Sequence, residues 1–284
     1  MFEMIFENKN GKQLHFGAGT PYTITEFSGL NPPKAVININ ETALLDGATF
    51  NSSKLQMRSI NVAFAIEYDA EDSRLKCYEV IQNKHPLRIY YKSERLDVFI
   101  DGYVEEFDFT YFAKKIIATV SVLCPAPYLK GAQEVVNELT DIISVFHFPF
   151  ASTATPELVM GEIDTLTDVA VENEGNVICG LTFELYARKA LKNPSVYNYL
   201  TGEFFKINID MQMGDLITVT TGQGNKTISL LRSAVSTNIF NLLDKNSTWL
   251  QLDIGGSVFV YEVEEGQATD LIITIKHYDL YEGV

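Results

Sequence analysis

Apolar and polar residues alternate with a period of two along much of the chain. The clearest run is 58–66, where positions 60, 62, 64 and 66 are large and apolar. This spacing predicts a strand with one buried face. Short apolar runs between turn residues predict further strands in the first half of the chain. They cover 35–40, 87–91, 96–100, 103–107 and 116–123. Asp101-Gly102 lies between two of these strands and predicts a tight hairpin.

A helix is expected to interrupt these strands. It should begin at Asp69, whose side chain can cap it, because the acidic residues that follow favour a helix N-terminus. Leu75, Tyr78 and Ile81 would then share one face of the helix. Pro86 requires the helix to end before it.

Turn residues such as Gly, Asn and Pro recur about every ten residues in the second half, a spacing typical of antiparallel sandwiches. The strands predicted between these turns are 181–186, 204–209, 216–220, 226–230, 249–252, 258–261 and 271–275. We therefore expect an antiparallel β-sandwich, with a jelly roll as its topology. Trp249 is expected in the core of this sandwich rather than as a platform for stacking a sugar.

The pattern changes near 130–145, which indicates a domain boundary. Residues 130–143 have a loose helical spacing and are expected to form a short helix or a linker. Residues 1–140 carry 14 basic and 18 acidic side chains, whereas residues 141–284 carry 8 and 19. We expect a mainly β protein with two domains, 1–135 with one short helix and 136–284 as the sandwich.

The composition excludes several classes of function. The formal charge is −15, from 22 Lys and Arg and 37 Asp and Glu. This argues against sequence-independent binding of nucleic acid, which needs a basic face to neutralise phosphates, and against adhesion to anionic lipid. The sequence contains no run of about 18 apolar residues. Residues 1–7 lack the features of a signal peptide, so folding in the cytoplasm is expected.

The sequence marks no catalytic, metal or cofactor site. The three cysteines are far apart and are interpreted as buried hydrophobic residues, and the four histidines lack metal-binding spacings. Residues 222–227 resemble a nucleotide loop only in composition, because no helix is expected after them to hold a phosphate. Glu262, Glu264 and Glu265 suggest a glycosidase carboxylate pair, but a solvated strand face explains them more simply.

These features together resemble the distal tail protein (Dit) of long-tailed siphophages, the siphovirus-type tail component family. In the first half the resemblance lies in the strand entered at Arg58, the acidic turn into the helix, and Cys124-Pro125-Ala126-Pro127-Tyr128. In the second half it lies in segments 146–150, 171–176, 199–203, 247–252 and 281–284. The family's turn after the tryptophan strand usually resembles Pro-Gly-Asn, whereas residues 253–257 here offer only glycines for the turn.

The resemblance implies a hexameric ring that forms the hub of a phage baseplate. An N-terminal ring-forming domain, a β-sandwich or α+β fold, would stack on the tail tube protein on one side and on a tail-tip or tail-associated protein on the other. The C-terminal domain would be a galectin-like β-sandwich that can carry receptor-binding proteins. The protein would act in the virion tail tip after assembly in the host bacterial cytoplasm, with neither cofactor nor membrane. DNA would pass through the ring without binding, and we expect a net negative lumen.

The resemblance therefore implies assembly surfaces and no enzymatic activity. The ring-forming strands would be 58–66, 87–107 and 116–128, and an apolar edge strand such as 116–123 could pair with a neighbouring subunit. The same strands are equally compatible with the core of a monomer. The oligomer-interface candidates on them are Arg58, Ile60, Val62, Phe64, Tyr90, Phe99, Phe107, Ile117 and Val120.

Two other hypotheses stay open at this point. A carbohydrate-binding adhesion module that contacts the host cell wall would show an exposed aromatic cluster on a concave sheet. The residues to inspect, for a glycan or for a peripheral partner, are Tyr186, Tyr197, Tyr199 and Tyr261. A glycan-processing enzyme would need two carboxylates about 5–10 Å apart in a cleft, and the sequence marks no such pair.

Overall fold

The structure, a computed structural model, describes residues 2–41, 46–110, 115–138, 141–143, 162–164 and 168–284. The chain divides into two compact units. Unit 1 comprises Met1–Ala132 and Leu280–Val284, and unit 2 comprises Gln133–Asp279. The described residues are mainly in β-strands, which confirms the predicted fold class. A ring-forming role for one domain and a galectin-like fold for the other stay predictions.

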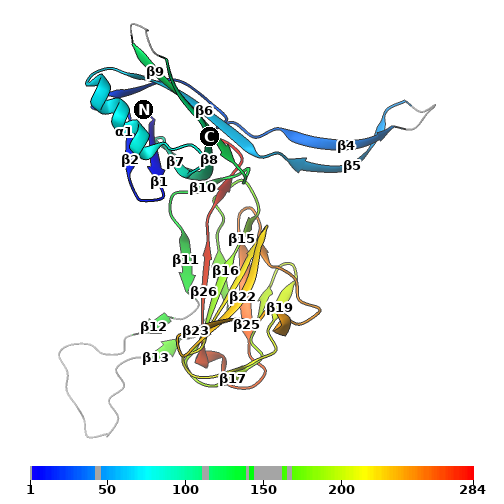
Figure 1. Cartoon of the computed structure of the whole chain (residues 1–284). Coiled ribbons are helices and arrows are strands. Elements are labelled where there is room, and N and C mark those ends of the chain that lie inside the picture. Colours follow the sequence, from blue (N-terminus) through cyan, green and yellow to red (C-terminus); the bar gives the residue numbers. More distant parts are fainter. Residues whose placement is uncertain (1, 42–45, 111–114, 139–140, 144–161, 165–167) are drawn as a thin grey trace, which may run out of the picture. The chain divides into compact units, whose positions relative to one another are not determined.

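Unit 1 is built on a nine-stranded sheet (Figure 1). Its main strand order is β2-β1-β7-β8-β9-β6-β3, and β10 pairs with both β8 and β27. All of these pairs are antiparallel. The strands are β1 (Glu3–Asn8), β2 (Gln13–Phe16), β3 (Tyr22–Ser28), β6 (Arg58–Ile66), β7 (Pro86–Lys92), β8 (Asp97–Thr110), β9 (Ile116–Cys124), β10 (Leu129–Gly131) and β27 (Leu280–Tyr281).

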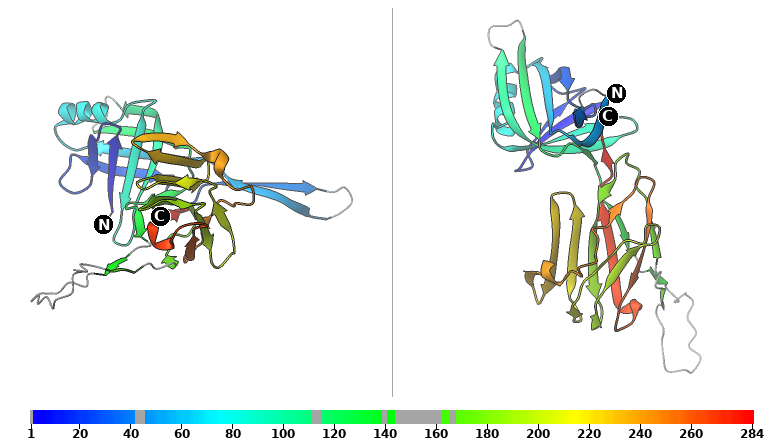
Figure 2. Two further views of the ribbon diagram at one scale, coloured as in Figure 1. Left: turned by 90° about the horizontal axis from the view of Figure 1, so that it is seen from below. Right: turned by 90° about the vertical axis from the view of Figure 1, so that its right-hand side faces the viewer.

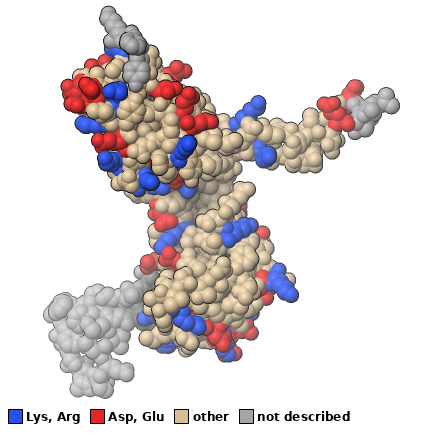
Figure 3. Space-filling model, in the orientation of Figure 1, with Lys and Arg blue, Asp and Glu red and all other residues tan. Residues whose placement is uncertain are grey.

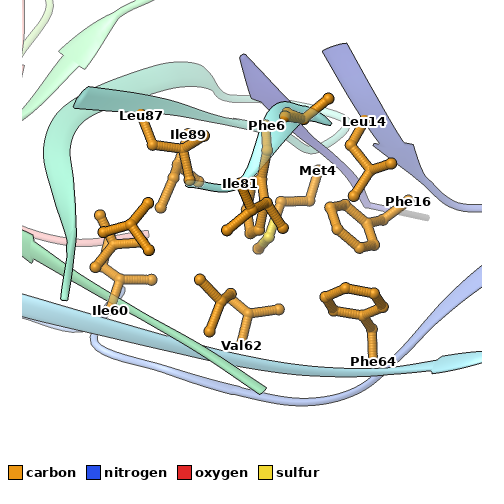
Figure 4. Packing of buried hydrophobic residues seen from close by; sticks show 14 of the residues in the cluster. Met4, Phe6, Leu14, Phe16, Ile60, Val62, Phe64, Ile81, Leu87 and Ile89 are labelled. Carbon is orange, nitrogen blue, oxygen red and sulfur yellow. The ribbon is translucent and has the colours of Figure 1, made fainter. Parts of the chain in front are cut away.

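Alternate residues of these strands point into one apolar core. In β6, Ile60, Val62 and Phe64 are fully buried, as the period-two pattern predicted. The rings of Phe6 and Phe64 both meet that of Phe16 edge to face, with centroid distances of 4.8 and 4.9 Å, and all three side chains lie in this core (Figure 4). Aromatic pairs in this geometry stabilise a core beyond the area that they bury.

The hairpin predicted at Asp101-Gly102 is wrong, because both residues lie inside one long strand, β8. The first part of β8 pairs with β7 and β10, and the later part pairs with β9. Gly102 allows close packing rather than a turn. A Cβ added to it would lie 2.6 Å from Val122 Cγ1 and 2.7 Å from Cys124 Sγ.

The predicted helix is present as α1 (Ala70–Val80), but it buries a different face. Leu75 is 50% exposed and Tyr78 is 39% exposed. Asp69 makes no side-chain cap; its backbone has a positive φ of 48°, and its carbonyl oxygen accepts a hydrogen bond from the Ser73 N–H at 2.8 Å. The buried helix residues are Ser73, Cys77 and Val80.

Unit 2 contains a six-stranded antiparallel sheet, β11-β26-β16-β21-β22-β23, and a four-stranded antiparallel sheet, β14-β25-β18-β19 (Figures 1 and 2). The first contains β11 (Val135–Glu138), β26 (Leu271–His277), β16 (Thr182–Ala187), β21 (Leu216–Gly222), β22 (Asn225–Arg232) and β23 (Val235–Asn238). The second contains β14 (Asp168–Val171), β25 (Ser257–Glu262), β18 (Ser195–Asn198) and β19 (Phe204–Lys206).

The two sheets of unit 2 share one core. Phe183 of β16 meets Phe205 of β19 and Phe259 of β25 with ring centroids 5.1 and 5.6 Å apart. Smaller elements complete the unit. They are β12 (Asp141–Ile143), β13 (Glu162–Asp164), β15 (Cys179–Gly180), β17 (Leu191–Lys192), β20 (Asp210–Met211), β24 (Gln251–Leu252) and the 3₁₀ turns η1 (Phe240–Leu242) and η2 (Ala268–Asp270).

The segment 130–143 forms short strands where a helix or linker was expected. It contains the end of β10, all of β11 and β12, and β11 pairs with β26 along its whole length. The loose helical spacing of its apolar residues therefore could not distinguish a helix from a half-buried strand at the edge of a sheet. Segment 146–150, which contributed to the family resemblance, lies outside the described residues.

Candidate functional site

Most of the predicted interface side chains lie inside unit 1. Tyr90 is half-buried and Ile117 is 36% exposed. The other seven are at most 8% exposed: Arg58, Ile60, Val62, Phe64, Phe99, Phe107 and Val120. A buried side chain cannot contact another subunit while the core stays packed. The prediction that these seven side chains contact a neighbouring subunit is therefore wrong, because they belong to the core of unit 1.

Strand β9 was expected to offer a free edge, and that expectation is wrong. It pairs with β8 on one side and with β6 along all nine of its residues on the other. Its backbone donors and acceptors are therefore used within the sheet, and strand addition by a neighbouring subunit cannot occur here.

Arg58 joins three segments of unit 1 from a buried position. Its Nη1 donates to the carbonyl oxygens of Gly29 and Asn31 at 2.7 and 2.9 Å. Its Nε and Nη2 both donate to the Pro127 carbonyl oxygen at 3.0 and 2.9 Å, and Nη2 also donates to that of Glu282. Burial lowers the pKa of Arg58. The residue is part of the framework of unit 1 and is not available for contact with a partner.

One exposed apolar surface of unit 1 lies on a two-stranded ribbon. Strands β4 (Ala35–Glu41) and β5 (Ala48–Leu55) pair only with each other among the described residues, apart from the nine-stranded sheet (Figure 1). Ile37 and Phe50 are each 62% exposed, and Ile39 is 52% exposed. A two-stranded ribbon cannot bury its own side chains, so this apolar surface faces water in the single chain.

The ribbon has one apolar and one polar face. Ile39 stands directly opposite Phe50, and Ile37 lies on the same face two residues away. On the other face Asn38 stands opposite Ser52, and its Nδ2 donates to the Ser52 Oγ at 2.9 Å. The middle of the ribbon carries no charged side chain in the view of Figure 3. We call residues Ile37, Ile39 and Phe50 the ribbon patch.

The four tyrosines considered as glycan or partner contacts do not form one cluster. Tyr261 is 1% exposed, so the prediction that it belongs to an exposed site is wrong, and it lies in the core. Tyr186 lies on the six-stranded sheet, whereas Tyr197 lies on the four-stranded sheet and stacks on Phe204 at 5.4 Å. Tyr199 is 74% exposed on the loop after β18.

Trp249 is half-buried, not in the sandwich core as expected. Its ring lies 5.6 Å from that of Phe240, and the Nζ of Lys226 lies 5.3 Å from its centroid. Such a cation over the ring is a stabilising contact. One face of the indole is therefore covered by the Lys226 amine.

Carboxylates near the C-terminal part of unit 2 are held as ion pairs. Glu264 contacts the Lys206 Nζ at 2.8 Å, and Glu265 contacts the Lys192 Nζ at 2.6 Å. Lys206 lowers the pKa of Glu264, whereas a glycosidase general acid needs a raised pKa. This arrangement does not support the hypothesis of a glycan-processing enzyme.

Two cavities of about 350 Å³ each are lined by described residues. One lies in unit 2 among Glu172, Glu174 and Asp279, and the other lies in unit 1 beside Phe2 and Ile24. Searched alone, the described residues contain no group of three or more His, Cys, Asp and Glu side chains that could hold a metal ion. In the same part of the chain no helix is long and apolar enough to cross a membrane.

The three cysteines are free, buried thiols. Burial raises the pKa of Cys77, Cys124 and Cys179 to about 12 in each case. A thiol is nucleophilic only as its thiolate, so these side chains are unreactive near neutral pH.

Sequence reasoning missed the ribbon patch. It identified 35–40 as a strand but did not consider where that strand would pair. The alternation of Ile37 and Ile39 with asparagines is the signal that was present. It is the signature of a half-buried strand, and no burial partner exists for it within the described chain.

The fold is similar to solved structures of phage tail proteins. Comparison with protein-family models gives no match to this sequence, and comparison with curated proteins gives none either. The Dit protein (gp 19.1) of phage SPP1, described as a paradigm of the hub adsorption apparatus in phages that infect Gram-positive bacteria, superposes with a TM-score of 0.68 at 14% identity over 98% of each chain.

The baseplate of phage P2 contains a similar chain. In its activated conformation with Ca, the TM-score is 0.54 at 12% identity, and all of both chains is covered. In the activated conformation with Sr, the TM-score is 0.52 at 12% identity over 98% of each chain. The chain thus has the fold of a phage distal tail protein along nearly its whole length, as the sequence resemblance predicted.

Proposed function

We propose that this chain is a structural hub protein of a phage baseplate, with no enzymatic activity. The likeness in fold to a Dit hub protein over 98% of both chains supports this role. In the proposed assembly the chains form a homo-hexameric ring that joins the tail tube protein to a tail-tip or tail-associated protein. Receptor-binding proteins would attach at its periphery, and the protein would act in the virion tail tip after assembly in the host bacterial cytoplasm.

The observation that carries the ring is the ribbon patch. A closed ring needs a heterologous contact, in which one surface of a subunit meets a different surface of the next. Ile37, Ile39 and Phe50 form an apolar surface on a ribbon that no other described residue covers. Burying such side chains between subunits gains about 25 cal/mol for each Å² removed from water. Exposed apolar surface of this kind marks a protein interface.

The ring is tested by the solution mass of the purified chain. We expect a mass near six times that of one chain by light scattering, and rings with a central hole by electron microscopy. Phe50→Asp should shift the mass to that of one chain, because it places a charge on the apolar face. Asn38→Asp adds the same charge on the polar face and should leave the ring intact.

The results that contradict the proposal differ from these. A wild-type chain that stays monomeric at every concentration contradicts self-assembly. A ring that survives Phe50→Asp shows that the ribbon patch is not its interface. Our hypothesis of a net negative lumen is tested by mapping charges on the ring, and a lumen lined by Lys and Arg would contradict it.

A further inference from the structure

A row of apolar side chains crosses the outward face of the six-stranded sheet in unit 2. Tyr186 of β16 stands opposite Ile272 of β26 on one side and Leu216 of β21 on the other. Leu216 in turn stands opposite Leu231 of β22. Paired residues on neighbouring strands point to the same face. Tyr186 and Leu231 are each 41% exposed, so this face lies toward water.

Most of the rest of the outward face is polar, although Val136 of β11 is apolar and 50% exposed on the same face. The next row lies two residues along each strand and consists of Glu138, Thr274, Glu184, Thr218, Ser229 and Asn238. From this row, Glu184 contacts the Nζ of Lys276, which lies in the row beyond it, at 2.7 Å. A solvated face of an antiparallel sheet is ordinarily polar throughout. The apolar row is therefore a local feature that the fold of unit 2 does not require.

The apolar row leads to a free edge. Leu231 stands opposite Ser236 of β23, and β23 is the last strand of this sheet in the described chain (Figure 2). All four residues of β23 are exposed, and none is charged. Natural edge strands are commonly protected by Lys, Pro or a bulge. Only its short length protects β23.

The ladder shows which backbone groups of β23 are free. Next to β23, the Ile239 N–H donates to the Ile228 carbonyl oxygen at 3.0 Å. Alternate residues of an antiparallel strand bond to the same neighbour, so Val235 and Thr237 also bond to β22. Ser236 and Asn238 alternate with the bonded residues Val235, Thr237 and Ile239. Their N–H and C=O groups therefore point away from β22, toward the open edge.

We propose that β23 binds an extended segment of a partner protein, which joins the six-stranded sheet as an additional strand. The outward backbone groups of Ser236 and Asn238 would bond to that segment. The partner residue opposite Ser236 would lie in line with Leu231 and Leu216. An aliphatic side chain at that position would extend the apolar row and be packed against it.

The charge of unit 2 defines the partner segment further. Residues 133–279 carry 8 Lys and Arg against 20 Asp and Glu, a net charge of −12, although β23 itself is uncharged. The segment that fits has an aliphatic centre with Lys or Arg on either side, because complementary charge steers association. The inference rests on the proposed role of a hub that carries other components, but not on the ring itself.

The test uses a defined peptide, Lys-Thr-Val-Thr-Val-Thr-Lys, with a fluorescent label. We expect saturable binding to the full chain by fluorescence anisotropy. Ser236→Pro should weaken binding at least tenfold, since proline removes the outward N–H, and the hairpin with β22 does not use that N–H. Ser236→Ala keeps the N–H, so a loss confined to the proline variant assigns the effect to the backbone.

A second pair of variants tests the apolar row. Leu231→Asp should weaken peptide binding about fivefold or more, a loss of about 1 kcal/mol. Thr227→Asp, on the same strand and face but away from the row, should bind as the wild type does. Absence of saturable binding, or equal binding by Ser236→Pro and wild type, overturns the proposal.

The same samples separate this inference from the ring. Light scattering reports ring assembly, which depends on the ribbon patch, whereas anisotropy reports docking at β23. If Ser236→Pro abolishes self-association of the chain instead of peptide binding, the occupant of β23 is a second copy, and the proposed partner is wrong.

Discussion

The guanidinium of Arg58 donates a hydrogen bond to the backbone carbonyl oxygen of Glu282, a residue 224 positions further along the chain. The other donors of Arg58 reach the carbonyl oxygens of Gly29, Asn31 and Pro127. One buried side chain thus fixes three backbone segments that belong to no common strand. Carbonyl dipoles surround its charge, and this makes burial of the guanidinium tolerable.

Arg58→Met should destabilise unit 1 by about 3–5 kcal/mol, because it removes the donors and leaves buried carbonyl groups unsatisfied. Urea unfolding followed by far-UV circular dichroism measures the loss. Arg88→Met is the control. Arg88 pairs with Asp101 on the surface at 2.6 Å, and such pairs contribute at most about 1 kcal/mol. Equal losses in the two variants would contradict the role assigned to Arg58.

Gly102→Ala should destabilise unit 1 by about 1–3 kcal/mol or more, since the new methyl group would overlap Val122 and the backbone of β9. Gly222→Ala is a matched control within a strand of unit 2, because a Cβ there meets no atom within 4 Å. Thermal unfolding of both variants measures the difference. If the two variants unfold at the same temperature as the wild type, the close packing at Gly102 is not as described.

Acid should weaken unit 2 through Asp215, whose side chain is 2% exposed. The Arg232 Nε donates a hydrogen bond to the Asp215 Oδ1 at 2.9 Å, and the Gln212 N–H donates another to Oδ2. These hydrogen bonds hold the pKa of Asp215 below its ordinary value. The unfolded chain therefore binds a proton more readily. The stability that this group contributes is present above about pH 4 and is lost as the pH falls through the folded pKa.

The single tryptophan, Trp249, lies in unit 2 and reports this effect by its fluorescence. We expect Asp215→Asn to be less stable than the wild type at pH 6, by about 1–3 kcal/mol. It should also lose less stability between pH 6 and pH 3. Glu203→Gln, at an exposed carboxylate, should follow the wild-type curve. Parallel curves for Asp215→Asn and wild type would show that Asp215 is not the titrating group.

The turn between β22 and β23 contains two non-glycine residues with positive φ, Ser233 at 50° and Ala234 at 64°. L-residues in this conformation cost roughly 1–2 kcal/mol each, and glycine costs less even after its greater loss of entropy. Ala234→Gly should therefore stabilise the chain by about 0.5–1 kcal/mol in urea unfolding. Ser236→Gly, in the extended part of the same hairpin, should destabilise it. The reverse order of the two variants would rule out strain in the turn.

Local pattern predicted the strands well where burial on one face determined them. Strand 58–66 was predicted with its observed bounds because Ile60, Val62, Phe64 and Ile66 all enter one core. Asp101-Gly102 misled because glycine serves both turns and close packing, and only the contact with Val122 distinguishes them. That contact joins residues 20 positions apart, beyond the reach of any local pattern.

The candidate surfaces were less predictable than the fold. An apolar residue in a strand has the same local signature whether it packs into its own core, as Val120 does, or stays uncovered, as Ile39 does. Sheet order decides between these outcomes, and sheet order follows from long-range pairing. For this reason the sequence indicated strands 58–66 and 116–123 as assembly surfaces, whereas the uncovered residues Ile37, Ile39 and Phe50 lie on the ribbon of β4 and β5.

The chain returns to unit 1 after unit 2, and this affects both folding during synthesis and the replacement of unit 2 by another domain. Strand β27 and the Glu282 acceptor of Arg58 follow all of unit 2 in the sequence, so a ribosome must pass through unit 2 before unit 1 can close. Unit 2 is in effect inserted into unit 1 and held by two covalent connections. We therefore expect that unit 2 can be replaced by another domain between 132 and 280 if the residues that return to Arg58 are retained.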